Sequence, residues 1–243
     1  FVIPNIEYLK GKEKNIRGVI FTHGHLDHIG AAPLILPKLG NPLIIGRPLT
    51  IEMIKHRLED FEKGSARFIK TTYINQISDK TRLGDFKISF FPVDHTIMDA
   101  VGVIISVPEA TIIHPGDWTI KHGPEMGDEI KYNQLARLPR PTILMLESIG
   151  ATNRQEPIAE REMLNNLYRL IESAPGRTII TTFSSQLERV KQILEYCSRV
   201  GKKVVLDGFS MKLNVGIAKK LGYIKEKKET IIPVERIHDY PEN

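Results

Sequence analysis

Four side chains that commonly bind metal ions fall within the stretch FTHGHLDHIG at residues 21–30: His23, His25, Asp27 and His28. Neutral imidazole and carboxylate groups bind zinc at about 2.0–2.2 Å, so one compact loop can supply several ligands. One tetrahedral ion cannot use all four groups from so short a stretch, whereas two ions about 3.5–4 Å apart can share them. The pattern predicts a metal site in which His23 and His25 serve one ion and Asp27 and His28 the other.

Further ligands must come from elsewhere in the chain. His95 ends the stretch FKISFFPVDH, and Asp117 lies in IIHPGDW. Both stand where an apolar strand is expected to give way to a loop, the position at which sites are usually built. Spacing alone leaves open whether each is a ligand or an ordinary loop residue. His114, on the same strand as Asp117, is expected to be structural or to support a ligand.

The elements that must position these residues are short strands in the first part of the chain. Apolar runs bounded by turn residues predict strands at 17–22, 41–46, 86–95, 101–107, 110–117 and 142–148. The last of these, TILMLES, is apolar enough to predict a fully buried strand. Helical spacing predicts helices at 31–39, ended by Gly40, and at 50–61.

After residue 150 the pattern changes to regular alternation of helices and strands. Helices are predicted at 159–173, 187–200 and 211–223, and strands at 177–183 and 202–209. Such alternation is typical of βαβ units and a parallel sheet, so a domain boundary is expected near residues 150–157.

Composition excludes several classes of protein. With 41% hydrophobic and 26% charged residues the chain is ordinary for a globular protein, and no run approaches the roughly 20 apolar residues of a membrane helix. The one cysteine, Cys197, excludes an intrachain disulfide, and nothing suggests export, so a cytoplasmic location is expected. The net charge of +5, much of it between residues 199 and 228, weakly favours a polyanionic partner; a solvated, lysine-rich helix face explains the basic run equally well.

The sequence motifs resemble a known family. THGHLDHIG, VDHTIMDAVG and HPGDW are similar to the successive motifs of the metallo-β-lactamase fold. LMLESIGATN, GRTIITTFSSQLERVKQI and DGFSMKLNVGIAKKLGYI are similar, in order and spacing, to the ribonuclease J branch of the β-CASP nucleases. The resemblance covers nearly the whole chain. The histidine-rich motif is common to the superfamily, and the later motifs are the ones that indicate the branch.

The resemblance implies an α/β fold in two parts. Residues 1–152 would form an αββα-type metallo-β-lactamase domain, and residues 153–243 part of an α/β, parallel-sheet β-CASP domain. The chain begins without an initiator Met and reads at both ends like the middle of a fold. We therefore expect it to be a fragment lacking the first strands and the C-terminal return of the first domain.

The resemblance also assigns residues to two zinc ions. His23, His25 and His95 would bind one Zn²⁺, Asp27 and His28 the second, and Asp117 would bridge both. Glu147 matches the first acidic motif of the β-CASP nucleases; the alternative is a strand-end carboxylate that faces solvent. Asp27, Asp117 and Glu147 are thus the predicted catalytic residues, Asp27 also orienting the attacking hydroxide.

The activity implied is zinc-dependent hydrolysis of RNA phosphodiesters, by 5′–3′ exonuclease and endonuclease cleavage, in RNA processing and decay. A hydroxide held between two zinc ions would attack phosphorus, since metal binding lowers the pKa of water to about 7. RNA is the expected partner, no membrane is involved, and the full-length protein is a possible homo-oligomer.

Three serines are candidates for binding RNA phosphates. Ser185 and Glu188 have the spacing of a capping box after a predicted strand, Ser184 precedes them, and Ser210 repeats the arrangement in GFSM. A helix N-terminus at the carboxyl edge of a parallel sheet favours anions. Plain helix capping is the alternative at each position.

Two departures from the family pattern limit what is expected of this chain alone. An early Asp that supports the site would lie before Phe1, and a histidine that completes the second zinc site would lie beyond Asn243. We expect the 243-residue chain by itself to be nearly inactive and to bind the second metal poorly. Two alternatives stay open: a non-catalytic RNA-binding β-CASP scaffold, and a hydrolase of the same fold acting on a small ester or thioester.

Overall fold

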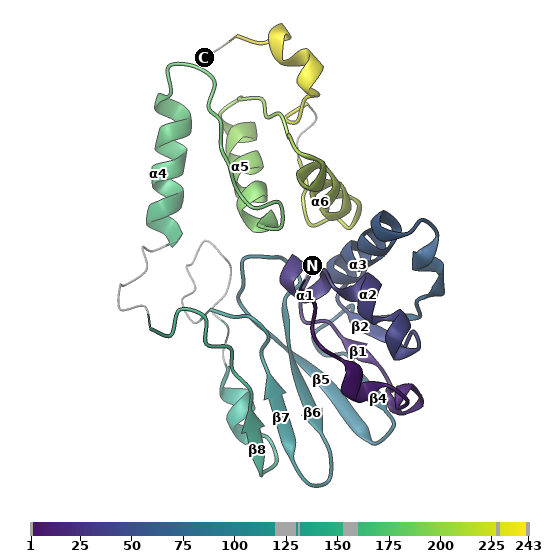
Figure 1. Cartoon of the computed structure of the whole chain (residues 1–243). Helices are drawn as coiled ribbons and strands as arrows, with labels where there is room; N and C mark the ends of the chain where they lie inside the picture. The colour runs from purple at the N-terminus through teal and green to yellow at the C-terminus, as the bar shows by residue number, and fades with distance from the viewer. Residues whose placement is uncertain (1, 120–129, 131, 153–159, 227–228, 242–243) are drawn as a thin grey trace. The chain divides into compact units, whose positions relative to one another are not determined.

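A computed structural model describes residues 2–119, 130, 132–152, 160–226 and 229–241, which fall into two compact units (Figure 1). The first unit lies within Phe1–Ile120 and Ile130–Ser148, and the second contains Ile149–Asn243. Residues 153–159, part of the predicted boundary, lie outside the described residues, and the domain limits at 152 and 153 stay a prediction.

The first unit contains two β-sheets. The smaller is parallel and consists of β1 (Val19–Ile20), β2 (Ile44–Gly46) and β3 (Thr71–Tyr73). The larger has the order β4 (Lys80–Leu83), β5 (Phe86–Pro92), β6 (Val101–Ser106), β7 (Thr111–His114) and β8 (Thr142–Leu144). Its first four strands are antiparallel neighbours, and β8 joins β7 in parallel.

Helices of the first unit lie beside the smaller sheet (Figure 1). They are α1 (Leu26–Ile29), α2 (Ala32–Ile35) and α3 (Pro48–Phe61). The unit also has 3₁₀ turns at Glu7–Leu9, Glu13–Asn15, Pro37–Leu39 and Ser65–Phe68, and one at Tyr132–Arg137 that packs on the larger sheet. The helix predicted at 31–39 is therefore divided between α2 and a 3₁₀ turn, because Pro37 cannot continue the α-helical hydrogen bonds. Gly40 ends it in the left-handed conformation, with φ of 77°.

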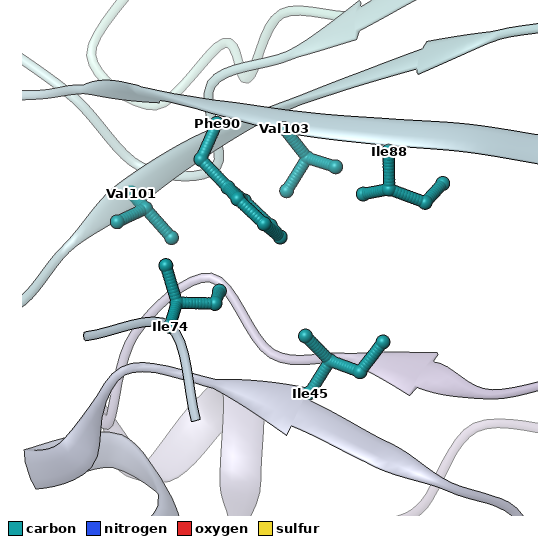
Figure 2. Close-up of a cluster of buried hydrophobic side chains, with 6 residues drawn as sticks. All are labelled: Ile45, Ile74, Ile88, Phe90, Val101 and Val103. Carbon is teal, nitrogen blue, oxygen red and sulfur yellow. The ribbon is translucent and has the colours of Figure 1, made fainter. Parts of the chain in front are cut away.

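The main core lies between the two sheets. Figure 2 shows Ile45 of β2 and Ile74, after β3, pointing toward side chains of β5 and β6. These are Ile88, Phe90, Val101 and Val103, each at most 7% exposed. Burying one such side chain contributes about 1.5–3 kcal/mol, so this cluster joins the sheets firmly.

The opposite face of the larger sheet is also covered. Phe91 pairs in register with Gly102, and a Cβ at Gly102 would stand 2.1 Å from the Phe91 ring. The missing side chain thus leaves room for the ring. Trp118 and Tyr132 pack on the same cluster, their rings 5.5 Å apart. Both consecutive phenylalanines of β5 are buried because the strand has a core on each face.

The strand predicted at 142–148 is shorter and more exposed than expected. β8 covers only Thr142–Leu144, and Ile143 and Leu144 are 51% and 56% exposed. The prediction of a fully buried strand is wrong. β8 is the edge strand of its sheet, paired with β7 alone, and among the described residues nothing buries its side chains.

The second unit contains α4 (Glu160–Ser173), α5 (Leu187–Arg199), α6 (Phe209–Lys220) and a 3₁₀ turn at Val234–Asp239. The three predicted helices are present, whereas the strands predicted at 177–183 and 202–209 form no ladder among the described residues. The one parallel contact there is an isolated bridge between Val204 and Ile231. Within the described part of the chain, no helix is both long and apolar enough to cross a membrane.

Candidate metal centre

The direction of the strands gathers the candidate residues at one edge of the larger sheet. β5 and β7 both run antiparallel to β6, and β8 is parallel to β7, so all three end at the same edge. His95, Asp117 and Glu147 each stand three residues beyond the end of one of these strands. His23 stands the same distance beyond β1.

The histidine loop is packed tightly against the helix layer. A Cβ at Gly24 would lie 2.8 Å from Sδ of Met53 on α3, so only glycine fits without a shift of that side chain. His25 is extended, with φ of −66° and ψ of 149°, and α1 begins directly after it. Asp27 and His28 are therefore on the first turn of α1, whereas His23 and His25 lie in the extended segment before it.

Four donor groups form the first possible metal site: His23, His25, His95 and Asp117. Nε2 of His95 lies 2.9 Å from Nδ1 of His25, and Oδ2 of Asp117 lies 3.8 Å from Nε2 of both His23 and His95. Two ligand atoms bound to one tetrahedral zinc ion stand about 3.3–3.5 Å apart. The observed spacings are close to those of a shared ion.

Three donor groups form a second set that shares Asp117 with the first. Nε2 of His28 lies 3.3 Å from Oδ2 of Asp117 and 3.5 Å from Oδ2 of Asp27. The Asp27 side chain is 72% exposed, against 16% for Asp117. The structure thus brings together all six predicted ligands in two overlapping sets; that they hold metal ions stays a prediction.

Burial keeps the histidines of the first set neutral. Desolvation, followed by the neighbouring imidazoles, lowers the pKa of His23 from 6.5 to about 2. Desolvation, then His95, lowers the pKa of His25 to about 4. Burial also lowers the pKa of His95, although the charge of Asp117 opposes this. Neutral imidazole is the form that binds metal ions.

The chemistry of the site fits a metal ion. His23 is fully buried, and its Nδ1 lies 3.1 Å from Oγ1 of Thr22. Its Nε2 faces the donor cluster and has no hydrogen-bond partner among the described residues. An unsatisfied polar atom in the interior is costly, and a cation among these nitrogen and oxygen donors would satisfy it.

The loops that bear His95 and Asp117 are tied to one another. The Thr119 N–H donates to the carbonyl oxygen of Asp94 at 2.9 Å; Asp94 directly precedes His95, and Thr119 follows Asp117 by two residues. Nδ1 of His114 accepts a hydrogen bond from the Gly116 N–H at 3.2 Å. His114 thus supports the turn that leads to Asp117, one of the two roles expected for it.

Glu147 is half-buried; burial lowers the pKa of His95, and the negative charge of Glu147 is the smallest of the influences that oppose this lowering. It is close enough for its charge to act on a ligand of the first donor set, and the alternative of a strand-end carboxylate that faces solvent stays open. Its catalytic role stays a prediction.

The serines belong to the second unit. Nδ2 of the buried Asn214 on α6 donates to the Ser184 carbonyl oxygen at 3.0 Å and lies 3.5 Å from its hydroxyl. Ser210 is exposed, one turn before Asn214 on the same helix. The two serines therefore lie on neighbouring segments.

The predicted capping box at Ser185 is wrong. The N-cap of α5 is Gln186, and no side chain caps that helix among the described residues. Oγ1 of Thr182 instead donates to Oε1 of Gln186 at 2.7 Å. Ser185 contributes its carbonyl oxygen to the Leu187 N–H, at 2.8 Å, so its hydroxyl has no capping role here.

Sequence reasoning missed two groups beside the donor cluster. Thr22 contacts His23 and directly precedes it in the histidine motif, so its position in the sequence is a signal for this role. The ion pair of Arg47 and Asp99 joins segments more than 50 residues apart. No local pattern relates two such positions, and only the fold brings them together.

The fold and these motifs are shared with known proteins. A model described as "Metallo-beta-lactamase superfamily" matches residues 2–181, and one described as "Ribonuclease J, beta-CASP domain" matches residues 175–243. Ribonuclease J of Thermus thermophilus is 32% identical, over 100% of this chain and 43% of the relative. Ribonuclease J of Mycoplasma pneumoniae is 31% identical, over 99% of this chain and 42% of the relative.

A solved structure shares the fold. A protein of unknown function from Enterococcus faecalis V583 superimposes with a TM-score of 0.65 over 93% of this chain and 57% of its own, at 19% identity. This likeness supports the architecture alone.

Together, the two facing sheets and the model that covers most of the chain place this protein in the metallo-β-lactamase superfamily. Within that superfamily the chain belongs to the ribonuclease J family, as the β-CASP match and the curated relatives show. The predicted α/β class, a metallo-β-lactamase fold followed by a β-CASP region, is confirmed. The chain spans less than half the length of these relatives.

Proposed function

We propose that this chain carries the metal centre of a zinc-dependent ribonuclease that hydrolyses RNA phosphodiester bonds, from the 5′ end and internally. The observation that supports this most strongly is Asp117, whose Oδ2 lies within 3.8 Å of three imidazole nitrogens from two donor sets. A carboxylate shared in this way suits two adjacent ions. The activity itself is proposed for a longer protein that contains this chain.

The residues divide the work of holding the two ions. His23, His25 and His95 would hold the first, Asp27 and His28 the second, with Asp117 between them. A bound pair of Zn²⁺ ions supplies water activation at neutral pH and neutralises charge on the phosphoryl oxygens. The low pKa values of His23 and His25 keep both imidazoles neutral, so one ring nitrogen of each has a lone pair available for a metal ion.

Two carboxylates are proposed to act directly in the reaction. The exposed Asp27 would accept a proton at a carboxylate oxygen from the attacking water and orient it toward phosphorus. Glu147, whose charge partly opposes the lowering of the pKa of His95 by burial, would hold a proton near the leaving group.

RNA is the proposed partner because the second unit offers polar and basic groups. Ser184 and Ser210 lie on neighbouring segments, and α6 also carries Lys212, Lys219 and Lys220. Lysines attract phosphates through long-range charge, and hydroxyls contribute short-range hydrogen bonds. Among the basic residues of the 199–228 run, Lys227 and Lys228 lie outside the described residues.

The test measures metal content and cleavage together. Zinc binding is measured on the 243-residue chain, and cleavage of 5′-monophosphate and 5′-triphosphate RNA on it and on a longer natural chain that includes it. His25→Ala should lower zinc affinity by 100-fold or more and abolish cleavage, since it removes a ligand of the first set. His56→Ala, on α3 and outside both donor sets, is the matched control and should change neither.

Each alternative predicts a different result. A longer natural chain that binds zinc and RNA but never cleaves RNA would be the scaffold. A longer natural chain that cleaves a thioester but not RNA would be the small-ester hydrolase. A chain that binds no zinc at any concentration would contradict the proposal altogether.

The two ions should bind in order. The first set offers four donors and the second only three among the described residues, one of them shared and one largely exposed. Calorimetric titration with zinc should therefore give a tight step followed by a step at least about 10-fold weaker, because each missing ligand reduces affinity. Two steps of equal affinity would contradict this assignment of ligands.

A separate experiment tests the serines. Ser185→Ala should leave the stability of α5 nearly unchanged, since the hydroxyl does not cap that helix. If Ser185 binds phosphate, the same change weakens RNA binding several-fold in a filter-binding assay. Unchanged RNA affinity would remove Ser185 from the site, and Ser184→Ala and Ser210→Ala extend the test.

A further inference from the structure

The loop that carries His95 is fixed by a largely buried ion pair. Asp99 follows His95 by four residues, and its side chain is 2% exposed, against 18% for that of Arg47. Nε of Arg47 donates to Oδ1 of Asp99 at 3.1 Å, and Nη2 of the same guanidinium lies 3.0 Å from that oxygen. Arg47 is the residue directly before α3, so the pair joins the His95 loop to a helix of the other layer.

Further hydrogen bonds hold both partners in place. The second carboxylate oxygen of Asp99, Oδ2, accepts from the Leu49 N–H in the first turn of α3 at 3.0 Å. Nη1 of Arg47 donates to the carbonyl oxygens of Ile74 at 3.1 Å and Asn75 at 2.8 Å. A buried charge pair is retained at little net cost only when such hydrogen bonds satisfy it, and removal of one partner leaves the other uncompensated.

The backbone at Asp99 is in an uncommon conformation. Its φ is 69°, in the left-handed region that residues other than glycine seldom adopt. Conformations of this kind persist where the surroundings impose them, and they are frequent beside functional sites. In this conformation the Asp99 carboxylate contacts both Arg47 and the Leu49 N–H.

The segment between His95 and Asp99 has little freedom. Ile97 and Met98 are 2% and 6% exposed, and two residues after Asp99 the Val101 N–H donates to the Thr22 carbonyl oxygen at 3.0 Å. Thr22 is also the residue whose hydroxyl contacts Nδ1 of His23. The His95 loop is thus anchored to α3 through Asp99 and to the neighbour of His23 through Val101.

We propose that Asp99, held by Arg47, is a positioning residue for the metal ligand His95. This inference rests on the proposed metal centre. To serve as a ligand, Nε2 of His95 must stay near Nδ1 of His25 and Oδ2 of Asp117, at the observed 2.9 and 3.8 Å. If the loop is no longer held at Asp99, the imidazole of His95 can move. Residues that orient a metal ligand typically contribute about 10- to 100-fold to metal affinity.

The test is a double-mutant cycle on zinc affinity in the 243-residue chain, measured by competition with a chromophoric chelator. Asp99→Asn removes the charge while keeping a side chain that tolerates positive φ. We expect it to weaken binding by about 10-fold or more. His95→Ala should weaken binding further. In the His95→Ala background, Asp99→Asn should have no additional effect, because the ligand it positions is gone.

Glu52→Gln is the matched control. It weakens a different ion pair on the same helix, Lys55 Nζ to Glu52 Oε1 at 2.8 Å. Zinc affinity should be unchanged. The absorption bands of bound Co²⁺ should change in Asp99→Asn, because the geometry of the ligands changes. Circular dichroism shows whether the variant is folded, and a folded variant that is merely less stable should keep the bands of the unchanged chain.

Several outcomes would overturn the inference. Unchanged zinc affinity in Asp99→Asn, or effects of Asp99→Asn and His95→Ala that simply add, would make the ion pair structural only. If Asp99→Asn fails to fold, Arg47→Lys keeps the charge but loses the forked contact, and it should show the same coupling to His95. Failure of the unchanged chain to bind zinc would contradict the proposed function, which distinguishes the two failures.

Discussion

At the scale of single residues, the donor cluster combines buried imidazoles with one shared carboxylate. His23 is fully buried and Asp27 is mostly exposed, although only four positions separate them. Burial lowers the pKa of the inner histidines, and this makes the site sensitive to acid before any metal binds.

The metal-free chain should lose stability as the pH falls below about 6.5. Between the unfolded value of 6.5 and the folded values, about 4 for His25 and about 2 for His23, the unfolded chain binds more protons than the folded one. The free energy of unfolding therefore falls with falling pH in this window. Urea titrations from pH 7 to pH 4.5 should show this, with a smaller slope for His25→Asn. An equal slope in that variant would contradict the pKa assignment.

Gly116 should be essential to the position of Asp117. Its φ is 71°, and a Cβ there would stand 2.8 Å from Oγ1 and 2.9 Å from Cβ of Thr22. We expect Gly116→Ala to lower the free energy of unfolding by about 3 kcal/mol, from backbone strain and overpacking. Gly11→Ala, with φ of 79° and no neighbour within 4 Å, should cost only about 1 kcal/mol. Equal costs in urea unfolding would refute the role of the close approach.

At the scale of elements, ligands distant in sequence meet because the strands that precede them end at the same edge of the sheet. β5, β7 and β8 end at one edge of the sheet, and the loops after them bear His95, Asp117 and Glu147. In the second unit, helix α6 brings two candidate serines close together, because its Asn214 donates a hydrogen bond to the Ser184 carbonyl oxygen.

Asn214→Ala should separate that segment from α6. The change leaves the Ser184 carbonyl oxygen without its partner at 3.0 Å, and we expect a loss of about 1–2 kcal/mol from the stability of the second unit. Lys212→Ala, on the same helix with an exposed contact to Asp207, should cost less than about 0.5 kcal/mol. Urea unfolding, monitored by hydrogen exchange, measures the loss of stability in each variant. Similar losses in Asn214→Ala and Lys212→Ala would contradict the structural role of Asn214.

At the scale of the whole molecule, all six candidate ligands lie in the first compact unit. Zinc that binds the folded state should therefore stabilise this unit selectively, by about 4 kcal/mol at a concentration 1,000 times the dissociation constant. Hydrogen-exchange mass spectrometry should show added protection in peptides from residues 19–30 and 86–119, with little change in those from 187–220. Protection that rises equally in both units would contradict the location of the site.

The sequence by itself determined the chemistry of the donor groups and most of the helices, because these depend on local patterns. A histidine cluster after an apolar run indicates a metal site wherever the loop lies, and helical periodicity located α3, α5 and α6. The family resemblance added Asp117 as the shared ligand, and the structure brings that residue between the two sets.

Only the tertiary structure decided burial, pairing and support. TILMLES is apolar enough for an interior strand, yet β8 is exposed because it lies at a sheet edge with a single partner. Ser185 and Glu188 have capping-box spacing, yet α5 begins at a different residue. Arg47 and Asp99 meet because two layers pack together. Such contacts join residues distant in sequence, and local spacing carries no information about them.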